Sequence, residues 1–206
     1  MERRELLKLI AVSTGAAFVC ADALAWDKPP QATALAKTGF SSDDLLLMND
    51  VAETILPKTN TPGAKDAQVG QMMAIFVADC YTADQQQLFK QGLLELNKLT
   101  TQQYAKPFLL LDSAQKHACL SELDQQAKTQ NSEAGLWGME SKKPNSRSPR
   151  DKSPLPHYFT LMKQLTLYSF FTSEVGATKV LRYVAIPGKY DGDLPYKKGD
   201  RAWATG

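Results

Sequence analysis

The chain has 206 residues, of which 43% are hydrophobic and 22% are charged, and its formal net charge is only +2. This length fits one domain with a sizeable hydrophobic core. The near balance of charges argues against a strongly basic nucleic-acid-binding protein and gives no reason to expect a strongly anionic partner.

The first 25 residues have the pattern of an export signal. A charged start is followed by a mildly apolar run from Leu9 to Cys20 and by the small-x-small cleavage site Ala23-Leu24-Ala25. The adjacent residues Arg3 and Arg4 resemble the twin-arginine signal, which directs folded proteins across the membrane. A short membrane anchor is the alternative, but the apolar run falls short of the roughly 20 residues that span a bilayer. We therefore expect residues 26–206 to form the mature domain.

Apolar side chains recur at helical spacing through most of the mature domain, which predicts an all-α fold of five or six helices. A serine before an acidic pair opens the first helix, and Pro57 ends it. Thr82 and Gln85 form a capping box at the start of the third. Helices are further predicted over residues 67–81, 83–104, 113–127, 155–171 and 173–181. The residues expected to face the core include Met73, Cys80, Ala118, Leu123, Met162 and Tyr168.

Two segments do not fit a helical pattern. Residues 128–154 are rich in Ser, Asn, Lys, Arg and Pro, so we expect a long polar loop there, either mobile or ordered by a partner. Residues 183–206 contain too many Pro and Gly residues for a helix, so we expect an extended C-terminal arm. Its aromatic residues are costly to leave in water and need a surface, either on the parent domain or on another protein. We predict that a partner docks through Tyr183, Tyr190, Tyr196 and Trp203.

Cys80 and Cys119 remain after removal of the signal. An exported protein meets an oxidising compartment, where a disulfide between these two residues is allowed. The alternative is that both are small buried side chains on helix faces. The sequence leaves both interpretations open.

The sequence carries few signatures of chemistry. It has no glycine-rich nucleotide loop, no nucleophile elbow and no C-x-x-C motif, so we expect no catalytic, cofactor-binding or metal-binding residues in this chain. His117 lies two residues before Cys119, which on a helix turns the two side chains to different faces. His157 stands at a helix start. Glu174 and Arg182 are spaced to form an ion pair at a helix end.

Several short motifs follow one another along the chain. After the twin-arginine signal come AETILP and TPGA, then DCY, then FTSEVG and YVAIPGKYDG, at residues 52–57, 61–64, 79–81, 171–176 and 183–192. In this order they resemble the gluconate 2-dehydrogenase subunit 3 family, the small subunits of bacterial membrane-associated flavoprotein dehydrogenases. The resemblance covers nearly the whole mature domain and is weakest over residues 128–154.

The resemblance implies a non-catalytic accessory role. In such complexes a large subunit of the glucose-methanol-choline oxidoreductase type binds FAD and oxidises a sugar or sugar acid. A third subunit with haem c often passes the electrons to the respiratory chain. The large subunit usually lacks an export signal, so the small subunit would guide it through the twin-arginine translocase into the periplasm and help it to fold. The complex would associate peripherally with the membrane, and no nucleic acid is expected as a partner.

A competing interpretation is an independent periplasmic enzyme or ligand-binding helical protein. It would place His157, Glu174 and Arg182 near one pocket. A neighbouring gene for a flavoprotein that lacks its own signal would favour the accessory subunit instead.

Overall fold

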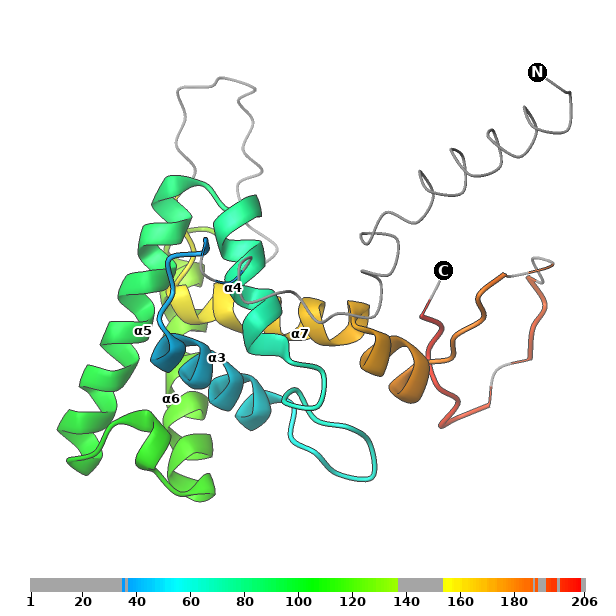
Figure 1. Ribbon diagram of the computed structural model, residues 1–206, viewed down its shortest axis with the longest axis horizontal. Coiled ribbons are helices and arrows are strands. Elements are labelled where there is room, and N and C mark those ends of the chain that lie inside the picture. Colours follow the sequence, from blue (N-terminus) through cyan, green and yellow to red (C-terminus); the bar gives the residue numbers. More distant parts are fainter. Residues whose placement is uncertain are drawn as a thin grey trace, which may run out of the picture. The chain divides into compact units, whose positions relative to one another are not determined.

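The structure is a computed structural model that describes residues 35, 37–136, 154–186, 188, 192–195 and 197–204 (Figure 1). The expected export signal, with Arg3 and Arg4, lies outside these residues, as do Tyr190 and Tyr196. The chain divides into two compact units, Met1–Lys37 and Thr38–Gly206, and the helices named below lie in the second unit. They are α3 (Ser42–Ile55), α4 (Val69–Cys80), α5 (Ala83–Tyr104), the 3-10 helix η2 (Phe108–Leu110), α6 (Ser113–Glu133), α7 (Tyr158–Thr172) and the π-helix η3 (Gly176–Val180). Because the described residues contain no strand, the predicted all-α fold is confirmed.

Capping side chains fix the first residue of several helices. Thr82 closes the predicted capping box at the start of α5, and the predicted serine cap of α3 is Ser41, which also forms a capping box. In each box a side-chain oxygen accepts a hydrogen bond from a backbone N–H that would otherwise have no partner. The cap of α6 is Asp112, whose carboxylate accepts from the Gln115 amide at 2.8 Å.

Two helix boundaries differ from the prediction. α4 begins at Val69, later than expected, because Gln68 adopts a left-handed backbone conformation with φ 52°. α6 continues to Glu133, so residues 128–133 of the expected polar loop are helical. The buried Asn131 accounts for this extension. Its side-chain oxygen accepts from the His157 amide at 2.8 Å, and its amide nitrogen donates to the Thr160 hydroxyl at 2.8 Å, which joins the end of α6 to the start of α7.

α7 is the central helix, since it contacts α3, α4, α5 and α6 (Figure 1). It approaches α5 closely at Gly92, where any added Cβ would collide with the Tyr158 side chain. This close fit explains a glycine inside α5, where the residue is otherwise unfavourable. The largest fully buried side chains come from every long helix and from η2, and include Met48, Met73, Phe89, Phe108, Leu123, Phe159 and Met162.

Three residues expected in the core lie elsewhere. On α6 Ala118 is exposed and Cys119 is buried, because Cys119 lies one turn before the buried Leu123 on the same helix face and Ala118 does not. Cys80 is the last residue of α4 and is exposed. Tyr168 lies on the C-terminal half of α7 and is 55% exposed, with the edge of its ring against Phe76 of α4 at 5.1 Å between centroids.

Candidate partner-binding surface

The C-terminal part of the helical unit begins where α7 ends. The hydroxyl of Ser173 accepts a hydrogen bond from the Gly176 amide at 3.0 Å, so this serine caps the next helical turn. The turn then widens into the π-helix η3, which the sequence does not predict. The described residues that follow it, 183–186, 188, 192–195 and 197–202, are named the C-terminal loop.

Arg182 ties the two ends of the C-terminal loop together. Its amide donates to the Ala202 carbonyl at 2.8 Å, and its own carbonyl accepts from the Ala204 amide at 2.9 Å. Its guanidinium group lies over the Trp203 ring, 4.7 Å from the centroid, and 3.6 Å from the Asp200 carboxylate. A cation over an indole ring and an exposed ion pair each contribute little alone, but here they reinforce two backbone hydrogen bonds at one residue.

These contacts revise the picture of an arm that is extended throughout. The described residues of this segment lack helix, as expected, but its ends meet, and Arg201 donates to the Lys179 carbonyl of η3 at 3.0 Å. The base of the loop is therefore fixed to the end of the helical unit. The ion pair predicted between Glu174 and Arg182 is replaced by the pair of Arg182 with Asp200, because loop closure brings this carboxylate beside the guanidinium.

The described part of the C-terminal loop carries uncovered apolar side chains. Ile186 is 84% exposed, and Tyr183 and Trp203 at the base are 48% and 46% exposed. Val184 and Leu194 are exposed as well. Single exposed apolar residues are common on protein surfaces, but a gathering of them marks an interaction site.

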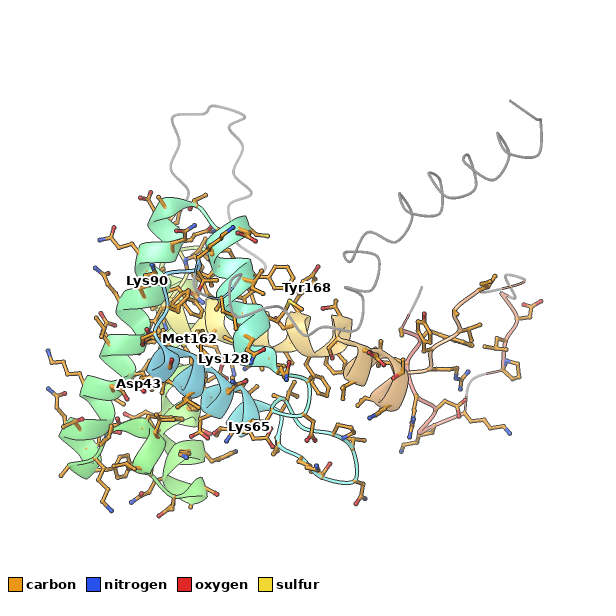
Figure 2. The ribbon with its side chains drawn as sticks, viewed as in Figure 1. Asp43, Lys65, Lys90, Lys128, Met162 and Tyr168 are labelled. Carbon is orange, nitrogen blue, oxygen red and sulfur yellow. The ribbon has the colours of Figure 1, made fainter. Side chains whose placement is uncertain are left out.

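The adjoining half of α7 adds apolar surface. Leu167, Tyr168 and Phe171 are exposed, while the N-terminal half of the same helix is buried on most sides. Figure 2 shows Tyr168 on α7 next to α4, in agreement with its contact with Phe76. The C-terminal half of α7 and the C-terminal loop together hold most of the described aromatic surface that no other part of the helical unit covers.

A polar loop, residues 57–68, joins α3 to α4 and contains the TPGA motif. The Glu53 carboxylate accepts from the backbone amides of Lys58 at 2.9 Å and of Lys65 at 2.8 Å. Gly63 packs against this carboxylate, and a Cβ at this position would lie 2.5 Å from one of its oxygens. A hydrogen bond from the Gly63 amide and the nearby Lys58 ammonium hold the pKa of the Asp66 carboxyl below its ordinary value.

Asp50 is the most enclosed ion-pair partner in this region. Its two carboxylate oxygens lie 2.6 Å from the Lys65 and Lys116 ammonium groups, and its side chain is only 13% exposed. Burial disfavours the charged form of Asp50, but the hydrogen bonds from Lys116 and Lys65 outweigh burial and lower the pKa. Asp50 thus links α3 to α6 and to the polar loop.

The residues of the competing interpretation do not converge on one pocket. His157 precedes α7 and Glu174 follows it, and these 15 residues of helix separate them by about 22 Å. The His157 ring is used locally, since its Nδ1 accepts from the Phe159 amide at 3.1 Å and caps α7. Arg182 is engaged at the base of the C-terminal loop.

Neither cysteine forms the disulfide that the sequence allows. Cys80 and Cys119 are both free, the first exposed at the end of α4 and the second buried on α6. Burial raises the pKa of the Cys119 thiol to about 11, which keeps it protonated and unreactive. His117 is exposed on the opposite side of α6 from Cys119, as its spacing predicts.

The described residues contain no group of three or more His, Cys, Asp or Glu side chains that could hold a metal ion. Two shallow hollows on the described surface lie along α6 and are lined by polar side chains such as Gln126, Thr129 and Glu133. In the same part of the chain no helix is long and apolar enough to cross a membrane.

The family described as Gluconate 2-dehydrogenase subunit 3 matches residues 42–188, which run from the start of α3 into the C-terminal loop. No significant match was found among curated proteins or among solved structures. Because the match covers well over half of the chain, this protein belongs to the gluconate 2-dehydrogenase subunit 3 family.

Proposed function

We propose that this chain is the non-catalytic small subunit of a periplasmic FAD-dependent dehydrogenase that oxidises a sugar or sugar acid. Its partner is a large flavoprotein subunit of the glucose-methanol-choline oxidoreductase type, and a subunit with haem c joins in many such complexes. The observation that carries the proposal is the family match across residues 42–188.

Guiding the flavoprotein out of the cytoplasm is the second half of the proposed role. The twin-arginine pattern at Arg3 and Arg4 marks a route for folded cargo. A large subunit without its own signal travels this route when it is bound to a subunit that has one. The exposed side chains of the C-terminal loop and of α7 support the proposal, because a protein that must hold a partner during transport needs apolar surface to bury.

Docking through the predicted aromatic residues is part of the same proposal. Tyr183 and Trp203 are both about half exposed, so each has ring surface to bury against a partner. Tyr190 and Tyr196 lie outside the described residues, and their part in docking stays a prediction from the sequence.

Co-purification tests the proposal directly. A tag on this chain, expressed from its native operon, should bring down a flavoprotein in equal amount, together with dye-reducing activity on a sugar or sugar acid. The chain expressed alone should show neither flavin absorbance nor turnover. If the isolated chain holds a stoichiometric flavin after dialysis, or turns over a sugar by itself, the accessory role is wrong.

A further inference from the structure

The C-terminal loop is closed within this chain, and the closure involves side chains that are far apart in sequence. Arg182 and Trp203 form a parallel backbone bridge, and the guanidinium group stacks on the indole ring. Just before Trp203 in the chain, two hydrogen bonds close a turn between Lys197 and Asp200. The Lys197 amide donates to the Asp200 carboxylate at 3.2 Å, and the Asp200 amide donates to the Lys197 carbonyl at 3.0 Å. Gly199 permits this tight turn because its φ is +96°.

A connector of this length has no structural need for closure. Loops without regular structure that exceed about 15 residues are mostly either functional or disordered. This loop follows the last helix of the unit and leads to no further described element. The contacts at its base therefore fix the conformation of the loop and do not position a further described element.

The side chains that the closed loop presents are those of an interface. Among the large apolar residues that the structure describes, Ile186 has the largest exposed fraction, and Tyr183, Val184 and Leu194 accompany it. The charges near the base are of both signs, with Lys197, Lys198 and Arg201 beside Asp200. Apolar side chains with a ring of mixed charges match the core and rim of a protein–protein interface.

We propose that the C-terminal loop is a preorganised docking element for the large subunit of the dehydrogenase, and that Arg182 is the positioning residue that holds it ready. This inference rests on the proposed function. The occupant follows from the family, because a chain of this family is one subunit of a dehydrogenase complex. Closing the loop before docking removes much of the ordering cost that a free tail would pay when it binds.

The first experiment tests the loop as a contact surface. Ile186→Ser should weaken the affinity of the purified chain for the large subunit by about tenfold, measured by biolayer interferometry. Its thermal melting should not change, because this side chain is almost fully exposed. The matched control is Leu94→Ser on α5, which alters a residue that is 69% exposed and should leave the affinity unchanged.

The second experiment tests the role of Arg182. Arg182→Gln removes the charge beside Asp200 and the cation over Trp203 but keeps both backbone hydrogen-bonding groups of the bridge. We expect faster hydrogen exchange at the Ala204 amide in the free chain and slower association with the large subunit. Arg182→Lys keeps the positive charge and should restore most of the association rate. If Arg182→Gln speeds exchange yet associates at the wild-type rate, preorganisation by Arg182 is refuted.

The remaining outcomes separate the two proposals. If the wild-type chain captures no flavoprotein at all, the proposed function fails. If it captures the flavoprotein and Ile186→Ser binds as tightly as the wild type, the function stands and the docking role of the loop is overturned. If the isolated chain forms a dimer in analytical ultracentrifugation that Ile186→Ser dissociates, while capture of the flavoprotein is unaffected, the occupant is a second copy and the proposal is again overturned.

Discussion

The ring of His157 caps the central helix only in its neutral form. Its Nδ1 accepts the hydrogen bond from the Phe159 amide, so a proton on Nδ1 would abolish the cap. Burial lowers the pKa of His157 below its ordinary 6.5, and the charge of Glu95 opposes this shift only in part. The ring stacks on Tyr158 at 4.3 Å between centroids, which adds to its desolvation. The stability of this helix start therefore depends on pH.

The direction of that dependence follows from the lowered pKa. The unfolded chain takes up the proton near pH 6.5, while the folded chain resists it to a lower pH. The stabilisation is therefore fully present above pH 6.5 and is lost as the pH falls through the lowered pKa. His157→Asn keeps a capping acceptor without a titrating group, so its free energy of unfolding should fall less than that of the wild type between pH 7 and 5.

Urea unfolding at several pH values measures this difference. His117→Asn, which changes the exposed histidine of α6, serves as the control for removing an imidazole elsewhere in the fold. Equal slopes for the wild type and His157→Asn would mean that the cap does not titrate in this range.

Other residues that link the helices are hard to recognise from the sequence. Asn131 and Asp50 sit in stretches that look like ordinary polar helix surface, yet each bonds to residues of another element. Their importance depends on which helix lies opposite, and no local pattern encodes that. The cysteines are a similar case. The sequence permits a disulfide, but the packing of the helices leaves the Cys80 thiol exposed and buries the Cys119 thiol in the core.

At the level of elements, the strongest local signals predicted the structure well. The capping box at Thr82 and the stop at Tyr104 give the limits of α5 almost to the residue. The errors arise where tertiary contacts override local preference. α6 extends beyond its expected end because the Asn131 side chain donates a hydrogen bond to Thr160 of α7. The turn after Ser173 is a π-helix and not a regular α-helix. Neither feature has a periodic signature in the sequence.

The polar loop between α3 and α4 depends on Glu53. Two backbone amides, those of Lys58 and Lys65, donate to its carboxylate from opposite ends of the loop. Glu53→Ala should therefore release both ends, lower the free energy of unfolding by about 1–2 kcal/mol and speed hydrogen exchange at both amides. Glu53→Gln retains one acceptor oxygen and should protect one of the two amides.

The control for the polar loop is Asp79→Ala, which removes an exposed carboxylate from α4. It should change the free energy of unfolding by less than about 0.5 kcal/mol. Unaltered exchange at Lys58 and Lys65 in Glu53→Ala would show that the loop is held by Asp66 and its neighbours instead.

For the whole molecule, the sequence could predict that the C-terminal segment is not helical and offers contact residues, but it could not predict the path of the chain. Its Pro and Gly residues excluded helix, and its aromatic residues indicated a surface for contact. The closure of the loop joins Arg182 to Asp200 and Trp203 across some twenty residues, and the nearer Glu174 was the more obvious partner by spacing. Contacts this distant depend on the path of the chain between them, which residue patterns do not specify.

Export of the whole complex should depend on the arginine pair at the N-terminus. We predict that replacing both Arg3 and Arg4 by Lys keeps this chain and the flavoprotein in the cytoplasm. Lysine preserves the charge, so a simple need for positive residues would still be met, whereas recognition of the planar guanidinium groups would be lost. Lys8→Gln removes a charge from the same segment without touching the pair and is the matched control.

The measurement is dehydrogenase activity in separated periplasmic and cytoplasmic fractions. In the wild type and in Lys8→Gln the activity should be periplasmic. In the double Lys variant the periplasmic activity should be lost, because the flavoprotein is not exported, and any activity that remains should be cytoplasmic. Because the large subunit is proposed to have no signal of its own, its location reports on this chain. Undiminished periplasmic activity in the double variant would mean that the flavoprotein reaches the periplasm by another route, and the escort role would have to be abandoned even if the two chains form a complex.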